Sequence, residues 1–333
     1  VRDSLQQKCD WLIQNETVMR KVSAFDWEQM IKLAGFIGAS AGQVMDLNKV
    51  KECKKLLKEV MGSLSRWRGT MSTIVITKMA LADDPLEYLH GIADVYAKLI
   101  AGKIYHSEYQ AMTAMFLYEL CPPDKIDDAV ERTLAQVELA GKNHPLITTY
   151  SQIPLIALMV LQDQDVEVMS ERAEECLALV KPLFPLYPET KQLLSYVLAC
   201  SDKPAQEKVD YFWSFYEELR AAKLEPDLSR MVAILAAYVD LEVPREQLIA
   251  EIGEVDKYLK GKKGYGMVVV GKRFRHMMAA ALVLADHENE FGAGRVGAMG
   301  TAIAEAVVEA IINAIILIII SSSAAAAASS SSH

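Results

Sequence analysis

Residues 71–99, MSTIVITKMALADDPLEYLHGIADVYAKL, decide the fold, because apolar side chains recur at helical spacing on both sides of one polar corner. The first run ends near Ala82 and the second extends from Leu86 to Leu99. Asp83 or Asp84 fits the N-cap of the second run, and Pro85 fits its first helical position. The stretch therefore predicts a helix, an acidic proline corner and a longer helix.

The same unit returns along the chain. Taking each unit from the start of its shorter helix, the units begin near residues 71, 109, 151, 191, 230 and 272. The polar corners at 121–124, 162–165, 201–204 and 240–244 separate the two helices of the units in between. A period near 40 residues with two helices per unit is typical of helical-repeat proteins. We therefore expect an all-α, α-solenoid-like array of helix pairs, since the one β-like run, 268–270, is too short to build a sheet.

Composition agrees with a soluble protein that has a sizeable core. The chain has 333 residues, 52% of them hydrophobic and 24% charged, with a net charge of −9. This acidic balance argues against nucleic acid as a partner, because phosphate binding needs a positive surface. The 5 cysteines are odd in number and widely separated, and the start is polar, without the apolar core of a signal peptide. We expect reduced thiols and a cytoplasmic protein.

The chain divides into four expected parts. Residues 1–290 form the helical-repeat domain, with a last short helix at 274–285, and 291–300 form a Gly-rich linker. An apolar helix at 301–320 follows, with a narrow polar stripe, and 321–333 form an Ala/Ser-rich disordered tail. The stripe consists of Thr301, Glu305, Glu309 and Asn313.

Three roles are open for the apolar stretch from Ala302 to Ile320. It could pack on the body of the protein or self-associate, contact a membrane surface, or serve as a C-terminal anchor. Its length nearly reaches that of a bilayer span, but Glu305 and Glu309 disfavour insertion.

Residues 264–273, GYGMVVVGKR, contain the G-x-x-x-x-G-K skeleton of a phosphate-binding loop. Such a loop follows a strand and has Ser or Thr after its lysine. Here the preceding residues, 252–260, read as a helix, and Arg273 takes the hydroxyl position. The skeleton therefore does not predict a nucleotide site.

The charge around this loop gives the main candidate site. Between residues 254 and 276 there are seven Lys or Arg against two acids. An acidic partner or anion could bind there, and at two arginines that flank Trp67, but these cations could equally complement helix ends and pair with acids. The candidate residues are Lys262, Lys263, Lys272, Arg273, Arg275, Arg66 and Arg68.

The sequence offers no specific catalytic or metal signature. No H-E-x-x-H motif occurs, and the histidines do not fall at ligand spacing with a second ligand. No predicted strand is present to place a serine in the strand-to-helix turn of a nucleophile elbow. We predict no catalytic residue, no metal site and no cofactor.

Several stretches in order carry a resemblance to a known family. They are SRWRG at 65–69, SEY at 107–109, HPLIT at 144–148, GYG…GKRFR at 264–275, and the Ala/Ile-rich then Ala/Ser-rich end. Together they resemble the uncharacterised bacterial domain-of-unknown-function family numbered four thousand and three. The resemblance covers essentially the whole chain and implies a bacterial cytoplasmic protein, with no activity to transfer.

The expected function is therefore that of a scaffold that binds a protein or peptide, as helical-repeat superhelices generally can. One alternative is an enzyme or binder of a small anionic ligand that uses the Arg/Lys cluster. Another is a membrane-peripheral protein that acts through residues 302–320.

Overall fold

The computed structural model describes residues 2–23, 26–62, 65–69, 71–101, 107–145, 152–161, 165–183, 188–225, 234–266 and 270–294. Side chains are not described for Arg66, Glu189 and residues 288–294. Within these ranges all regular structure is helical and no strand occurs, which confirms the all-α prediction.

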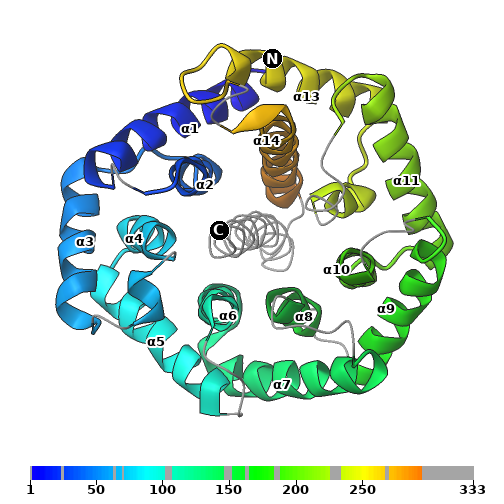
Figure 1. Ribbon diagram of the computed structural model, residues 1–333, viewed down its shortest axis with the longest axis horizontal. Coiled ribbons are helices and arrows are strands. Elements are labelled where there is room, and N and C mark those ends of the chain that lie inside the picture. The colour runs from blue at the N-terminus through cyan, green and yellow to red at the C-terminus, as the bar shows by residue number, and fades with distance from the viewer. Residues whose placement is uncertain are drawn as a thin grey trace, which may run out of the picture.

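Two classes of helix alternate along the chain. Figure 1 shows the outer helices running around the rim of a ring, with the inner helices seen nearly end-on inside them. The outer helices are α1 (Asp3–Val22), α3 (Leu47–Val60), α5 (Pro85–Ala101), α7 (Ile126–Asn143), α9 (Val166–Val180), α11 (Ala205–Ala221) and α13 (Arg245–Lys260). The inner helices are α2 (Glu28–Ser40), α4 (Ser72–Leu81), α6 (Glu108–Leu120), α8 (Ile153–Val160), α10 (Pro188–Ala199) and α14 (Gly271–Gly294). Short 3₁₀ turns are η1 (Arg66–Arg68), η2 (Pro123–Lys125) and η4 (Tyr238–Asp240).

Sequence patterning explains which helix lies where. The outer helix α3 buries one stripe, Val50, Cys53 and Leu57, and is otherwise rich in lysine and glutamate. The inner helix α8, IPLIALMV, is apolar all round and every one of its residues is buried. An all-apolar helix is stable in water only when other elements cover all its faces, so helices of this kind occupy the inside.

Helix ends follow the predicted capping chemistry. Asp84 Oδ1 accepts hydrogen bonds from the backbone N–H groups of Leu86 (2.8 Å) and Glu87 (3.0 Å), and Pro85 is the first residue of α5. A complete capping box begins α6, where Ser107 and Gln110 cap each other's backbone. The polar corners therefore end one helix and begin the next, as the sequence indicates.

The last described helix is longer than predicted. We expected it to end at Ala285, but α14 continues to Gly294, so residues 291–294 of the predicted linker are helical. Residues 286–290, DHENE, do not break a helix, and glycines near its end cost little. The rest of the linker, the apolar stretch 301–320 and the tail 321–333 lie outside the described residues.

The helical array closes on itself. α14 packs against α13, which precedes it, and also against α1 and α2 from the opposite end of the chain. Figure 1 shows α13 and α14 beside α1 and α2, completing the ring. None of the described helices combines the length and hydropathy that crossing a membrane would need.

Close packing of α1 and α2 needs glycine where the two helices meet, at Gly35 and at Gly38. Asn15 of α1 is fully buried; its side chain donates to the Gln43 carbonyl (2.9 Å) and accepts from the Met45 backbone N–H (2.7 Å). A Cβ at Gly38 would lie 2.4 Å from Asn15 Nδ2. Only glycine at position 38 therefore leaves room for the amide that holds the start of α3.

We predict that Gly38→Ala lowers the free energy of unfolding by about 1–3 kcal/mol, because Asn15 must move away from its two backbone partners. Urea unfolding followed by circular dichroism measures the change. The matched control is Gly141→Ala in α7, where a Cβ meets no atom within 4 Å. That substitution should raise stability by about 0.5–1 kcal/mol. Equal effects of the two substitutions would contradict the packing argument.

Candidate functional site

The connector between α13 and α14, residues 261–270, and the start of α14 together carry most of the candidate site, and Tyr265 anchors the connector. Tyr265 is fully buried and its hydroxyl donates to Glu16 Oε1 at 2.6 Å. Burial and the nearby negative charge of Glu16 raise the pKa of Tyr265 well above its ordinary value, so the phenol stays protonated and can donate. The connector is thereby fixed to α1, which lies 249 residues earlier in the chain.

Lys32 of α2 lies on the face of the same ring. Its Nζ is 3.5 Å from the ring centroid of Tyr265, and 3.2 Å from both Glu16 Oε2 and Glu28 Oε1. The side chain of Lys32 is fully buried. A buried ammonium is tolerated only when it is paired, and here two carboxylates and an aromatic face surround it.

Glycine is required next to this anchor. Gly264 has φ +87°, and a Cβ there would lie 2.7 Å from Glu28 Oε1 and 3.1 Å from Lys32 Nζ. Glu28 is in turn held by Arg20, whose Nη1 donates to Oε2 at 2.6 Å and whose Nη2 also bonds Oε1. The hydrogen bonds from Arg20 lower the pKa of Glu28. The connector therefore docks onto a fully formed charge network.

A second contact joins the chain's beginning to α13 and α14. The Arg2 guanidinium bonds Glu251 Oε1 (2.9 Å) and Asp286 Oδ2 (2.7 Å), and Ser4 donates to the same Asp286 oxygen (3.0 Å). His287 Nε2 lies 2.6 Å from Glu251 Oε2. Burial raises the pKa of Glu251, but hydrogen bonds from its neighbours outweigh this and hold it below the ordinary value. We read this cluster as structural, since its charged groups bond to one another.

Arg275 serves the fold rather than a ligand. It is buried, its Nε donates to Asp256 Oδ1 at 2.7 Å, and its Nη1 donates to the Tyr265 carbonyl at 3.2 Å. The adjacent His276 is also buried, and its Nδ1 lies 3.0 Å from the Glu225 carbonyl, so that nitrogen carries the proton. Burial lowers the pKa of His276, which keeps the ring neutral. Both residues fix the first turn of α14 on its neighbours.

Other candidate residues lie on the connector and in the first turn of α14. Lys263, Lys272 and Arg273 are exposed, while Lys262 is half-buried with its Nζ 4.1 Å from the ring centroid of Tyr258. Two further lysines shortly before them in the sequence, on α13, are also exposed, and none of these five exposed cations forms a salt bridge with another described residue. We call the following residues the basic surface: Lys257, Lys260, Lys263, Lys272 and Arg273.

The predicted arginines near Trp67 lie elsewhere. Arg68 belongs to η1, between α3 and α4, and its Nη1 donates to the Met61 carbonyl at 3.2 Å. Trp67 is buried against Tyr96, with their ring centroids 5.4 Å apart. The side chain of Arg66 lies outside the described residues. In the ring, α1 and α2 come between η1 and the connector, so the structure does not join Arg68 to the basic surface (Figure 1).

Among the described residues, several cysteines are kept in the unreactive thiol form, and the carboxylates do not gather into a metal-binding group. Burial raises the pKa of Cys9 and Cys200 to about 12 and that of Cys53 to about 11, which keeps these thiols protonated and unreactive. Among the described residues, no group of three or more His, Cys, Asp or Glu is arranged to hold a metal ion. The element before the connector is the helix α13, and not the strand that a phosphate-binding loop follows.

A model of the family described as "Protein of unknown function (DUF4003)" matches residues 18–324. The chain belongs to this family. The resemblance found in the sequence is thereby confirmed, and it covers both the helical ring and most of the C-terminal stretch. No curated protein and no solved structure matches the chain significantly.

Sequence reasoning missed the anchor of this DUF4003 chain. No motif in the sequence marks Tyr265, Asp286 or His287 as a closing contact. Their partners have no local signal either, because Glu16 lies 249 residues from Tyr265 in an amphipathic helix and Arg2 lies 284 residues from Asp286, just before that helix. The one available hint was an aromatic residue between two glycines, where its backbone can approach another element closely.

We predict that Tyr265→Phe lowers the free energy of unfolding by about 1–3 kcal/mol, because the buried Glu16 carboxylate loses a donor that water cannot replace. Chemical denaturation measures the loss. The control is Tyr118→Phe, since the Tyr118 hydroxyl bonds to none of the described residues; it should change stability by less than about 0.5 kcal/mol. If Tyr265→Phe were equally neutral, the hydroxyl would not be part of the anchor.

The Arg20–Glu28 pair predicts a pH dependence. The pKa of Glu28 in the folded protein is lowered from 4.5. The contribution of the Arg20–Glu28 pair to the free energy of unfolding is therefore fully present above pH 4.5, and it is lost as the pH falls through the folded-state pKa. Glu28→Gln should remove this contribution. We expect the variant to have a lower free energy of unfolding than wild type at neutral pH, and the difference between the two proteins to decrease as the pH is lowered. Urea midpoints measured between about pH 6 and 3 test this. Parallel curves for the two proteins would exclude the pair as a source of stability.

Proposed function

We propose that this protein is a non-enzymatic scaffold that binds another protein or peptide through an acidic segment. The observation that carries the proposal is the basic surface: five exposed cations on one short stretch of a chain whose net charge is −9. Opposite charge steers a partner to such a surface and sets its orientation.

The contacts next to these cations support the proposal, because they hold the backbone on both sides. Tyr265 is anchored in the first helix pair, and Arg275 is held by Asp256 on α13. Lys263 lies two residues before Tyr265, and Lys272 and Arg273 lie in the first turn of α14, next to Arg275. A backbone held on both sides loses little conformational freedom on binding, so less of the interaction energy is lost to ordering.

A small anionic ligand is the second candidate, and the geometry favours it less. Small-molecule sites are concave and converge on a few polar groups. The five cations are exposed side chains of α13, the connector and the first turn of α14, while the guanidinium of Arg275 is occupied by Asp256. A membrane-peripheral role is the third candidate, and it depends on residues 302–320, outside the described ranges.

We also infer that the helix pairs are units of a repeat with a period near 40 residues, and that the protein is located in the bacterial cytoplasm. The inner helices α4, α6, α8 and α10 begin at Ser72, Glu108, Ile153 and Pro188, roughly 35–45 residues apart. The cysteines are all free thiols, which suits a reducing compartment.

We predict that the triple variant Lys263/Lys272/Arg273→Ala loses more than about 90% of partner capture, because binding to an acidic segment rests on these charges. Tagged protein is expressed in the native cell, and the captured partners are quantified by mass spectrometry. The affinity for a purified partner is then measured by direct titration at two salt concentrations.

The control for this experiment carries the same change in net charge at another site. Lys51, Lys55 and Lys58 are exposed on α3, so Lys51/Lys55/Lys58→Ala removes three positive charges away from the connector. That variant should keep its partners. If both triple variants capture the same set of proteins as wild type, the basic surface is not the binding site.

A further inference from the structure

The inner helices are buried on every face. All residues are buried over 110–117 in α6, 153–160 in α8 and 274–287 in α14. Because an α-helix has 3.6 residues per turn, eight consecutive buried residues cover its whole circumference. Each of these helices therefore has neighbours on all sides.

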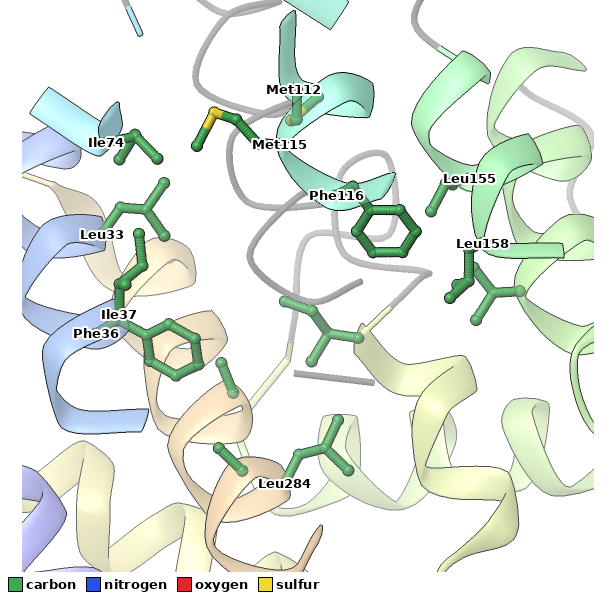
Figure 2. Packing of buried hydrophobic residues seen from close by; sticks show 14 of the residues in the cluster. Leu33, Phe36, Ile37, Ile74, Met112, Met115, Phe116, Leu155, Leu158 and Leu284 are labelled. Atoms are coloured by element: carbon green, nitrogen blue, oxygen red, sulfur yellow. The ribbon is translucent and has the colours of Figure 1, made fainter. Parts of the chain in front are cut away.

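Described elements account for three of these sides. An outer helix lies behind each inner helix, and other inner helices lie beside it, while the fourth side faces the centre of the ring (Figure 1). Figure 2 shows that the side chains on this fourth side are large and apolar and gather around one central space. They are Leu33, Phe36, Ile37, Ile74, Met112, Met115, Phe116, Leu155, Leu158 and Leu284.

The burial of these ten side chains is nearly complete, with exposed fractions between 0% and 5%. Packed helices lie roughly 8–10 Å apart. Six equal cylinders in contact around a circle leave room for one more of the same diameter, so a ring of inner helices leaves room for at least one helix. Side chains that face such a space become this inaccessible only if another element fills it, and an apolar lining favours an element that is itself apolar.

No helix among the described residues lies along the centre of the ring (Figure 1). The internal stretches outside the described ranges are short, the longest being 226–233, and each is tied at both ends to neighbouring helices. The chain after α14 is different, since it extends from 295 to 333 and contains the apolar stretch 302–320. It also starts from an inner helix, with Gly297 and Gly300 to let it turn back.

Residues 302–320 fit the ring centre in length and chemistry. As a helix they span about 28 Å, and α2, with its 13 residues, spans about 20 Å. Most of their surface is Ala, Val, Ile and Leu, matching the apolar lining. Their polar groups fall at i, i+4 steps on one stripe. Glu305 and Glu309 are in the first half, where they can stay close to the rim and water, and Asn313, further along, is uncharged.

We propose that residues 302–320 of this chain form a helix that fills the centre of the ring and packs against α2, α4, α6, α8 and α14. The segment completes the core from within, which leaves neither the ten lining side chains nor its own apolar surface exposed. This assignment is independent of the basic surface and of any partner that binds there.

Photo-crosslinking of the full-length protein tests the proposal. We would replace Ile312 by p-benzoylphenylalanine, irradiate the purified protein, and map the crosslinked peptides by mass spectrometry. The same replacement at Ile316 gives a second variant, should the first perturb folding. The control position is Ser330, in the tail. We expect crosslinks within one chain, from Ile312 or Ile316 to peptides of α2, α4, α6 or α8, and a several-fold lower yield from Ser330.

Three other results would overturn the proposal. Covalent dimers as the main product would place the segment between two copies of the chain. Crosslinks to lipid, with loss of the intramolecular product when anionic phosphatidylglycerol vesicles are added, would place it in a membrane. The third result is an intramolecular crosslinking yield at positions 312 and 316 that is no higher than at position 330. If the variants also unfold at the same midpoint as wild type, this result would place residues 302–320 in solvent.

Discussion

The buried ammonium of Lys32 is the constraint on which the closure of the ring depends. It has no access to water, so it is stable only between Glu16 and Glu28 and under the ring of Tyr265. Three of these four groups come from α1 and α2, and the fourth comes from the connector before α14. The buried charges of the first helix pair are therefore covered by the Tyr265 ring only when the end of the array lies against that pair.

The same closure positions the surface that we assign to partner binding. Gly264 allows the connector to approach Glu28 and Lys32, Tyr265 fixes it there, and the neighbouring cations are left facing outward. Arg2 joins Glu251 and Asp286 in a second closing contact. Charge is thus used in two ways at this junction. The paired, buried groups stabilise the closed ring. The exposed cations, which have no salt bridge to a described residue, remain available to an acidic segment.

Closing the array also changes what its concave side can be. An open helical-repeat superhelix offers that side to a partner. In a closed ring the inner helices turn the same side toward a shared centre, where Phe36, Phe116 and Leu284 are buried (Figure 2). The centre then belongs to the core. This is why we place the proposed partner site outside it, on α13, the connector and the start of α14.

The sequence by itself determined the helices of the middle of the chain and the residues at which they begin and end. Apolar spacing identified α4 to α11 closely, and Asp84, Pro85 and Ser107 ended or began helices as their local chemistry requires, because these features depend on neighbouring residues. Family membership was also readable from short ordered stretches. Only the tertiary structure decided that the array closes, that Arg275 is paired while Lys263, Lys272 and Arg273 are free of described partners, and that Tyr265 is an anchor. These depend on groups about 20 to 250 residues apart, and no local pattern encodes which distant carboxylate a side chain will meet.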